Sequence, residues 1–272
     1  METTQRGAAI TASGLSLRGS RGWVYRDVTF TAPAGGLVAV EGPAGSGRTC
    51  LLLTLAGRMR PTSGSGSVGG PPLPRHMAAV RRIAALGTVP GVNELDPSLT
   101  VAEHLHERAL LHRRFGEGLV RALTHGRARR RADERLRTGQ ALEIAGLTLK
   151  DLPNGPRTPV RDLDALDTLR LGIALALLAR PAMLCLDDAD RGLASADRAL
   201  AWRTLRTVAD TGVTVVATCA EAPGEGVTVR LGPPSADKAE KGARQRTPGT
   251  EDGTEDSARK EAADACAQAR RS

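Results

Sequence analysis

The sequence predicts an α/β fold, and three observations support that prediction. A glycine-rich stretch at 42–49 lies between two apolar runs, at 37–40 and 50–56, which is the order strand, loop, helix. A second apolar run at 183–186 ends in two aspartates. Aromatic residues make up only 2% of the 272 residues, so Leu, Val and Ala must build the core, as in aliphatic strands covered by helices. This length allows a sizeable core, in one large domain or in one and a half.

The N-terminal part is expected to be rich in strands. Alternating or apolar patterns predict strands at 10–17, 23–31 and 37–40. A helix is expected to follow the glycine-rich loop over 49–59. Gly, Ser and Pro between 64 and 74 predict a short strand and loops, and 83–89 is predicted to be a further strand.

The rest of the chain is expected to be mainly helical. Thr100 and Glu103 form a capping box before a helix over 101–115. An arginine-rich helical stretch is predicted at 119–147, with an interruption near Gly126. Asp164 opens a long apolar helix that ends before Pro181. The remaining expected elements are a buried strand at 182–186, an amphipathic helix at 195–210, and strands at 213–217 and 227–231.

The composition changes near residue 232. From 233 to 272 the chain contains eight Lys or Arg and eight Asp or Glu and lacks large apolar residues. Such a segment cannot bury enough apolar surface to offset its ordering entropy. We therefore predict a domain over 1–232 and a disordered, charged tail over 233–272.

A local excess of arginine contributes to the net charge of +8. Its members are Arg113, Arg114, Arg121, Arg127, Arg129, Arg130, Arg131, Arg135 and Arg137. This arginine cluster could be a solvated helix face, a contact to anionic lipid, or a contact to nucleic acid. Because the scarcity of aromatic residues argues against base stacking, nucleic acid is the least favoured partner.

The glycine-rich loop fits a phosphate-binding pattern. Its members are Gly42, Pro43, Ala44, Gly45, Ser46, Gly47, Arg48 and Thr49, with Cys50 next in the helix. Glycines allow successive backbone N–H groups to point at anionic oxygens, and the helix N-terminus adds partial positive charge. Arg48 stands where such loops have lysine. A glycine-rich turn that binds nothing is the alternative interpretation.

A phosphate loop works with a magnesium ion, which needs oxygen ligands. Thr49 is the expected direct ligand, and Asp187 the carboxylate that holds the ion, usually through water. A strand-end aspartate that only caps the next turn is the alternative for Asp187. We expect a nucleotide phosphate and Mg²⁺ as the ligands of the site.

The four cysteines have no metal-type spacing, which favours a reduced, cytoplasmic protein. The first residues lack the apolar core of a signal peptide, and the longest apolar run, 171–179, is too short to cross a bilayer. A membrane role is therefore expected to depend on a partner.

Several stretches together resemble the nucleotide-binding subunit of an ABC transporter, in the same order along residues 8–231. The similar stretches are 42–47 (Walker A), 55–57, 61–64, 86–91, 99–105, 176–181, 186–188 (Walker B) and 192–193. The resemblance implies the P-loop NTPase core of the ABC-ATPase type. Such a core has a parallel sheet flanked by helices, N-terminal antiparallel strands and a helical subdomain at about 92–180. It also implies ATP, Mg²⁺ and a membrane transporter subunit as partners, at the inner face of the cell membrane.

The chain departs from this family at working positions. Arg48 replaces the Walker A lysine, and Asp188 stands where the family has its catalytic glutamate, which makes it the candidate general base. Gly91 replaces the Q-loop glutamine, Ala194 the D-loop aspartate, and Cys219 the histidine that contacts the γ-phosphate.

The signature motif departs most, because it is replaced by residues 163–167. Asp164 and Asp167 would face the phosphate bound by an opposite subunit, unless Asp164 is simply a helix cap. These substitutions predict weak or impaired hydrolysis in an ATP-binding subunit. The alternative is an inactive cassette with a regulatory or structural role, as a heterodimer beside a competent cassette.

Overall fold

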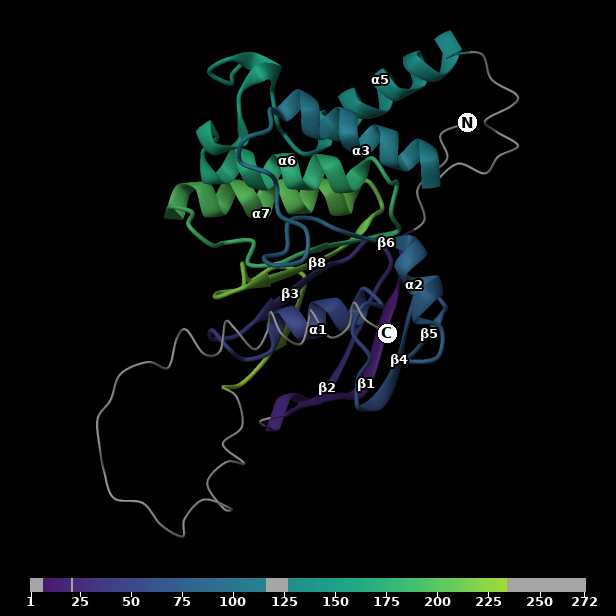
Figure 1. Ribbon diagram of the computed structural model, residues 1–272. Coiled ribbons are helices and arrows are strands. Elements are labelled where there is room, and N and C mark those ends of the chain that lie inside the picture. Colours follow the sequence, from purple (N-terminus) through teal and green to yellow (C-terminus); the bar gives the residue numbers. More distant parts are fainter. Residues whose placement is uncertain (1–6, 21, 116–126, 234–272) are drawn as a thin grey trace.

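The computed structural model describes residues 7–20, 22–115 and 127–233. Two β-sheets and their covering helices make up this part of the chain (Figure 1). Residues 119–126 of the helical stretch predicted at 119–147 and residues 234–272 of the tail predicted at 233–272 lie outside the described residues, as do most side chains of the arginine cluster.

The smaller sheet is antiparallel and comes from the N-terminal part, as the resemblance implied. It contains β1 (Ile10–Gly19), β2 (Gly22–Ala32), β4 (Ser63–Val68) and β5 (Pro72–Leu73), in the order β2-β1-β4-β5. This confirms the strands predicted at 10–17 and 23–31.

The larger sheet is parallel and has five strands in the order β6-β7-β8-β3-β9. These are β3 (Leu37–Glu41), β6 (Ala84–Leu86), β7 (Met183–Leu186), β8 (Thr214–Cys219) and β9 (Val227–Arg230). The glycine-rich loop follows β3 and the paired aspartates follow β7. Only β8 lies between these two strands.

Helices cover both faces of the parallel sheet (Figure 1). On one face, α1 (Arg48–Leu55) lies between this sheet and the antiparallel sheet. On the other lie α6 (Ala165–Leu177) and α7 (Ser195–Asp210), with α3 (Val101–Phe115) and α5 (Arg127–Ile144) beyond them. Two short 3₁₀ helices, Gly155–Arg157 and Val160–Asp162, precede α6.

One helix was not predicted. The segment Met77–Ile83 forms α2, which precedes β6 directly, and β6 is shorter than the strand predicted at 83–89. Of its seven residues only Val80 is buried, so its sequence lacks a clear helical apolar stripe. The helix α1 is also shorter than predicted, because Gly57 adopts a positive φ of 71° soon after its end.

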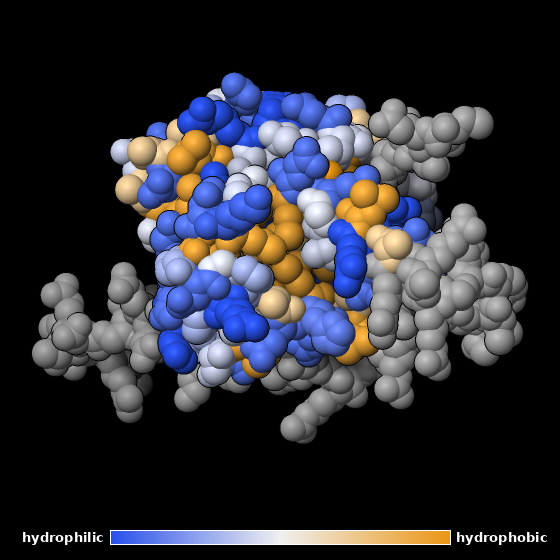
Figure 2. Space-filling view, turned by 90° about the horizontal axis from the view of Figure 1, so that it is seen from above, coloured by the Kyte–Doolittle hydropathy of each residue, from blue (hydrophilic) through white to orange (hydrophobic). Residues whose placement is uncertain are grey.

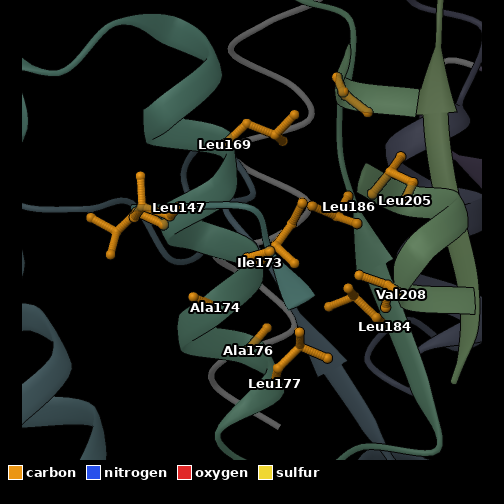
Figure 3. Packing of buried hydrophobic residues seen from close by; sticks show 14 of the residues in the cluster. Leu147, Leu169, Ile173, Ala174, Ala176, Leu177, Leu184, Leu186, Leu205 and Val208 are labelled. Atoms are coloured by element: carbon orange, nitrogen blue, oxygen red, sulfur yellow. The ribbon is translucent and has the colours of Figure 1, made fainter. Parts of the chain in front are cut away.

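Alternation along the parallel strands creates two cores. In β3, Leu37 and Ala39 pack with α6 and α7, whereas Val38 and Val40 pack with α1 and the antiparallel sheet. Figure 3 shows the first core, where Ile173 and Leu177 of α6 lie close to Leu184 and Leu186 of β7.

Both predicted caps are present. The Thr100 hydroxyl accepts from the Glu103 N–H (3.3 Å), and the Glu103 carboxylate accepts from the Thr100 N–H (2.8 Å). Asp164 caps α6 by accepting from the Asp167 N–H at 2.7 Å. Each carboxylate also lies at a helix N-terminus, where negative charge is stabilised.

The helical side of the molecule presents a hydrophobic strip bordered by hydrophilic residues (Figure 2). Among the described residues, the exposed large apolar side chains are Leu110 and Leu111 on α3 and Leu136 on α5. We found no helix in the described ranges with the length and apolar character needed to span a bilayer.

We expect Ile173→Ala to lower the free energy of unfolding by about 2–5 kcal/mol. Ile173 is fully buried between α6 and the sheet, so truncation leaves a cavity. Urea unfolding followed by circular dichroism measures the change. Leu136→Ala is the matched control, because Leu136 is 63% exposed and its truncation should cost little. Equal losses for both variants would contradict this packing.

Candidate nucleotide-binding site

The loop after β3 has a backbone that requires glycine. Gly45 and Gly47 have φ of 79° and 86°, and Gly47 is the N-cap of α1. A Cβ on Gly47 would lie 2.5 Å from the carbonyl oxygen of Val24, and one on Gly42 would lie 2.6 Å from Ser46 Oγ. The turn is closed by the Ser46 N–H, which donates to the carbonyl of Pro43 at 3.2 Å.

Asp187 joins three elements. Thr49, in the first turn of α1, donates its hydroxyl to the Asp187 carboxylate, with distances of 2.8 and 3.1 Å to the two oxygens. Thr218 of β8 donates its hydroxyl to Asp187 Oδ1 at 2.6 Å. The same Thr218 oxygen accepts from the backbone N–H of Asp188 at 2.7 Å. The two predicted magnesium ligands, Thr49 and Asp187, are therefore in direct contact.

Asp188 contacts the arginine of the loop. Its Oδ1 lies 3.0 Å from Arg48 Nη2, and its Oδ2 lies 3.8 Å from Nη1 of Arg191. The backbone φ of Asp188 is 45°, a left-handed conformation that Asp and Asn tolerate better than most residues. Both oxygens of the candidate general base thus face a cation.

Burial raises the pKa of Asp187 above its ordinary value, and the neighbouring Asp188 charge raises it further. The hydrogen bonds from Thr218 and Thr49 and the charge of Arg48 act in the opposite direction and lower this pKa. Asp187 is therefore a carboxylate whose ionised form needs a compensating cation.

The residues present fit a nucleotide phosphate and Mg²⁺. Ser46 Oγ and Arg48 Nη1 are buried polar atoms that lack a hydrogen-bond partner within the described part of the chain. Buried polar groups ordinarily have a partner, so unsatisfied donors beside a helix N-terminus suit an anionic ligand. Thr49 and Asp187 offer the hard oxygen ligands that Mg²⁺ prefers.

The remaining predicted residues of the loop differ in their burial. Cys50 is buried within α1, whereas Pro43 and Ala44 are exposed at the tip of the loop. Pro43 contributes the carbonyl that closes the turn.

The segment that carries Gly91 folds on itself. Gly91 has a φ of 71°, and its N–H donates to Glu94 Oε1 at 2.8 Å. The side chain of Asn93 accepts from the Val89 N–H at 3.1 Å and donates to the carbonyl of Gly87. The amide side chain of this segment is thus used to hold its own loop.

Cys219 points into the core. Its thiol is fully buried, lies 3.8 Å from the carbonyl oxygen of Val40, and has a pKa that burial raises to about 12. The backbone after it is held by Asp190, whose carboxylate accepts from the N–H groups of Ala220 and Glu221 at 2.8 and 3.4 Å. Ala194 precedes α7 as its N-cap residue and makes no side-chain capping bond.

At the start of α6, the structure agrees with the capping interpretation of Asp164. Asp167 forms an ion pair with Arg170 of the same helix at 3.2 Å, and Leu166 is buried. The two carboxylates therefore have intrachain partners.

The structure brings Arg48, Thr49, Asp187 and Asp188 into one contact network. Sequence reasoning missed three residues that organise this network or its surroundings: Thr218, Asn93 and Asp190. A polar residue at the end of a buried strand, as at Thr218, is a signal that could have found the first of them.

The fold and the loop define the class: the chain has an α/β P-loop NTPase fold. A model of the ABC transporter family matches residues 25–191, and the chain belongs to that family. One relative is a Nod factor export ATP-binding protein I from Burkholderia lata, 31% identical over 195 residues, or 72% of this chain and 57% of the relative. Another is the daunorubicin resistance ATP-binding protein DrrA3 of Streptomyces coeruleorubidus, 31% identical over 75% of this chain and 54% of the relative. The chain thus spans just over half the length of these relatives.

Solved structures support the same fold. A dimeric bacterial ABC transporter cassette superposes with a TM-score of 0.62 at 19% identity, covering 82% of this chain and 94% of that one. CbiO1 of Clostridium perfringens, part of the ABC transporter complex cbiONQ, gives a TM-score of 0.61 at 18% identity, with 78% of each chain covered.

We expect Asp187→Asn to raise the melting temperature at neutral pH. The pKa of Asp187 is higher in the folded than in the unfolded state. The contribution of Asp187 to the free energy of folding is therefore fully present below the unfolded pKa and is lost as pH rises through the folded pKa. An uncharged amide avoids this loss, so the gain should disappear at acidic pH. Thermal unfolding across pH measures it, with Asp197→Asn on α7 as the control. A variant less stable than wild type at neutral pH would contradict the burial argument.

Proposed function

We propose that this chain is the ATP-binding subunit of an ABC-type transporter and that its hydrolysis of ATP is weak or impaired. The observation that most directly supports the proposal is the network of Arg48, Thr49, Asp187 and Asp188 at the N-terminus of α1. Family membership supports nucleotide binding, and the details of this network support slow turnover.

In this proposal the backbone of 42–47 and the N-terminus of α1 bind the phosphates. Arg48 supplies positive charge, and its unpartnered Nη1 is a donor for a phosphate oxygen. Thr49 and Asp187 hold Mg²⁺, which when bound neutralises charge on the phosphates. Asp187 gains the cation that its buried carboxylate needs.

Three features support impaired hydrolysis. Asp188, at the position of the general base, directs one oxygen at Arg48 and the other at Arg191, so both carboxylate oxygens face cations of the chain and neither is left to orient a water. Gly91 has no side chain to orient water, and Asn93 is engaged in its own loop. The thiol of Cys219 is buried and lies 3.8 Å from the carbonyl oxygen of Val40, and a neutral thiol is a poor substitute for a histidine donor to phosphate.

We propose an integral membrane transporter subunit as partner, which would place the chain at the cytoplasmic face of the cell membrane. The exposed leucines Leu110 and Leu111 on α3 and Leu136 on α5 support such a contact. The names of the two relatives, Nod factor export and daunorubicin resistance, favour an export system. In this scheme residues 1–232 form the nucleotide-binding domain, with a helical part at about 92–180, and residues 233–272 form a tail outside it.

A second candidate is an inactive cassette that regulates or supports a competent one in a heterodimer. The carboxylates of Asp164 and Asp167 at the start of α6 favour it, because two like charges disfavour a facing phosphate.

We expect purified protein to bind MgATP, and Arg48→Ala to weaken that binding by about tenfold, because a charged donor is lost. Isothermal titration calorimetry measures the affinity. Arg203→Ala is the control, because Arg203 is an exposed arginine on α7. Equal binding by the wild type, Arg48→Ala and Asp187→Asn would contradict the assignment of the loop.

Hydrolysis by the same protein should fall well below the usual enzyme range of about 1 s⁻¹ and faster. A phosphate-release assay, with and without a co-purified membrane partner, measures it. Turnover within that range that Asp188→Asn abolishes would overturn impaired hydrolysis.

We also expect the wild type to remain monomeric with MgATP, because Asp164 and Asp167 would face the phosphate of a second copy. Size-exclusion chromatography with light scattering measures the mass. In the double variant Asp164→Ser and Asp167→Asn, serine keeps the helix cap while the charges are removed, so the dimer fraction should rise. A wild-type dimer that forms only with MgATP would contradict the repulsion.

A further inference from the structure

We propose that Asp188 is a movable counter-ion that competes with nucleotide phosphate for Arg48 and passes to Arg191 when phosphate binds. The inference rests on the proposed function in one respect, namely that the loop binds nucleotide phosphate. It assigns Asp188 a role in setting affinity that differs from proton transfer.

The first support is the contact itself. Arg48 Nη2 and Asp188 Oδ1 are 3.0 Å apart, and their side chains are only 13% and 26% exposed. A carboxylate on this guanidinium occupies the same kind of anionic position that a phosphate oxygen would take. A phosphate that engages Nη1 and Nη2 together therefore competes with Asp188 for Nη2.

The second support is the surroundings of Arg48. Its Nη1 is buried without a partner in the described part of the chain, so one half of the guanidinium is unsatisfied while the other is paired. The first turn of α1 contains no acidic residue. Asp188 therefore neutralises this charge from another element, the turn after β7.

The third support is that a second cation lies within reach of Asp188. Arg191 Nη1 lies 3.8 Å from Asp188 Oδ2, and Arg191 is 53% exposed. The Arg191 N–H donates to the Asp188 carbonyl at 3.0 Å, so both residues belong to one turn. When Asp188 leaves Arg48, its charge is not left unpaired, and only a side-chain rotation is needed.

The backbone allows this rotation without loss of the site. Thr218 holds Asp188 through the backbone N–H, and Asp187 through its carboxylate. The side chain of Asp188 can thus exchange partners while the position of its Cα stays fixed.

The test is the affinity of Asp188→Asn for ADP without metal and for a non-hydrolysable MgATP analogue, which removes hydrolysis from the measurement. Asparagine keeps the size and tolerates the φ of 45°. Asp188→Gly serves the same purpose if the amide variant fails to fold. We expect both ligands to bind about five- to tenfold more tightly than to wild type, because the competing carboxylate is gone.

Two controls separate competition from general electrostatics. Glu41→Gln removes the same charge directly before the loop, where Glu41 pairs with Arg230 at 3.2 Å and not with Arg48. Its affinity should change less than twofold. Arg191→Gln should weaken binding in the wild type, because Asp188 loses its second partner, and should have no effect in the Asp188→Asn background.

Unchanged or weaker binding by Asp188→Asn would overturn the proposal, as would an equal gain from Glu41→Gln or an equal effect of Arg191→Gln in both backgrounds. These results leave nucleotide binding by the wild type intact. Absence of binding by the wild type and every variant would instead overturn the proposed function as well. Binding by Asp188→Asn alone would support the proposal most strongly.

Discussion

The order of strands in the parallel sheet is the constraint on which the site depends. The carboxyl ends of β3, β7 and β8 lie at one edge, with β8 in the middle. Neighbouring strands are about 4.8 Å apart, so the ends of β3 and β7 are separated by roughly 10 Å. Thr218 at the end of β8 fills that interval and bonds to both Asp187 and Asp188. The first turn of α1 then reaches the same carboxylates through Arg48 and Thr49.

The charges of the side chains held by these strands determine which ligands the site can bind. Two adjacent carboxylates are buried or half-buried beside one guanidinium, in surroundings where unpaired charge is costly. In the proposed function, phosphate would bring negative charge to Arg48, and Mg²⁺ would bring positive charge to Asp187. Phosphate would meet Arg48, which already pairs with Asp188. Mg²⁺ would meet Asp187, whose pKa is raised by burial. In this proposal phosphate binding at Arg48 combines two events: the unpartnered Nη1 gains an acceptor, and Nη2 exchanges Asp188 for phosphate.

Most of the fold could be predicted from the sequence, because alternation in β1 and β2, the caps at Thr100 and Asp164 and the apolar run of β7 are local signals. The helix α2 could not, since a single buried residue leaves no periodic pattern. The residues of the site could be predicted from the glycine-rich loop and from the two aspartates that end the apolar run at 183–186. Their contacts could not, because Thr218 and Asp188 meet only through the pairing of strands 30 residues apart.

Arg48 and Asp188 are interpreted differently when each is considered alone and when their contact in the structure is taken into account. In the sequence each is a separate departure from an ABC cassette, and each alone weakens the case for catalysis. In the structure the longer arginine and the shorter aspartate form one contact of 3.0 Å. Removal of Asp188 would leave the Arg48 charge, which is only 13% exposed, without its carboxylate partner, so the role of Arg48 depends on Asp188. In the proposed function, such a pair keeps the affinity for phosphate adjustable while the candidate general base is engaged, which would separate the binding of nucleotide from its cleavage.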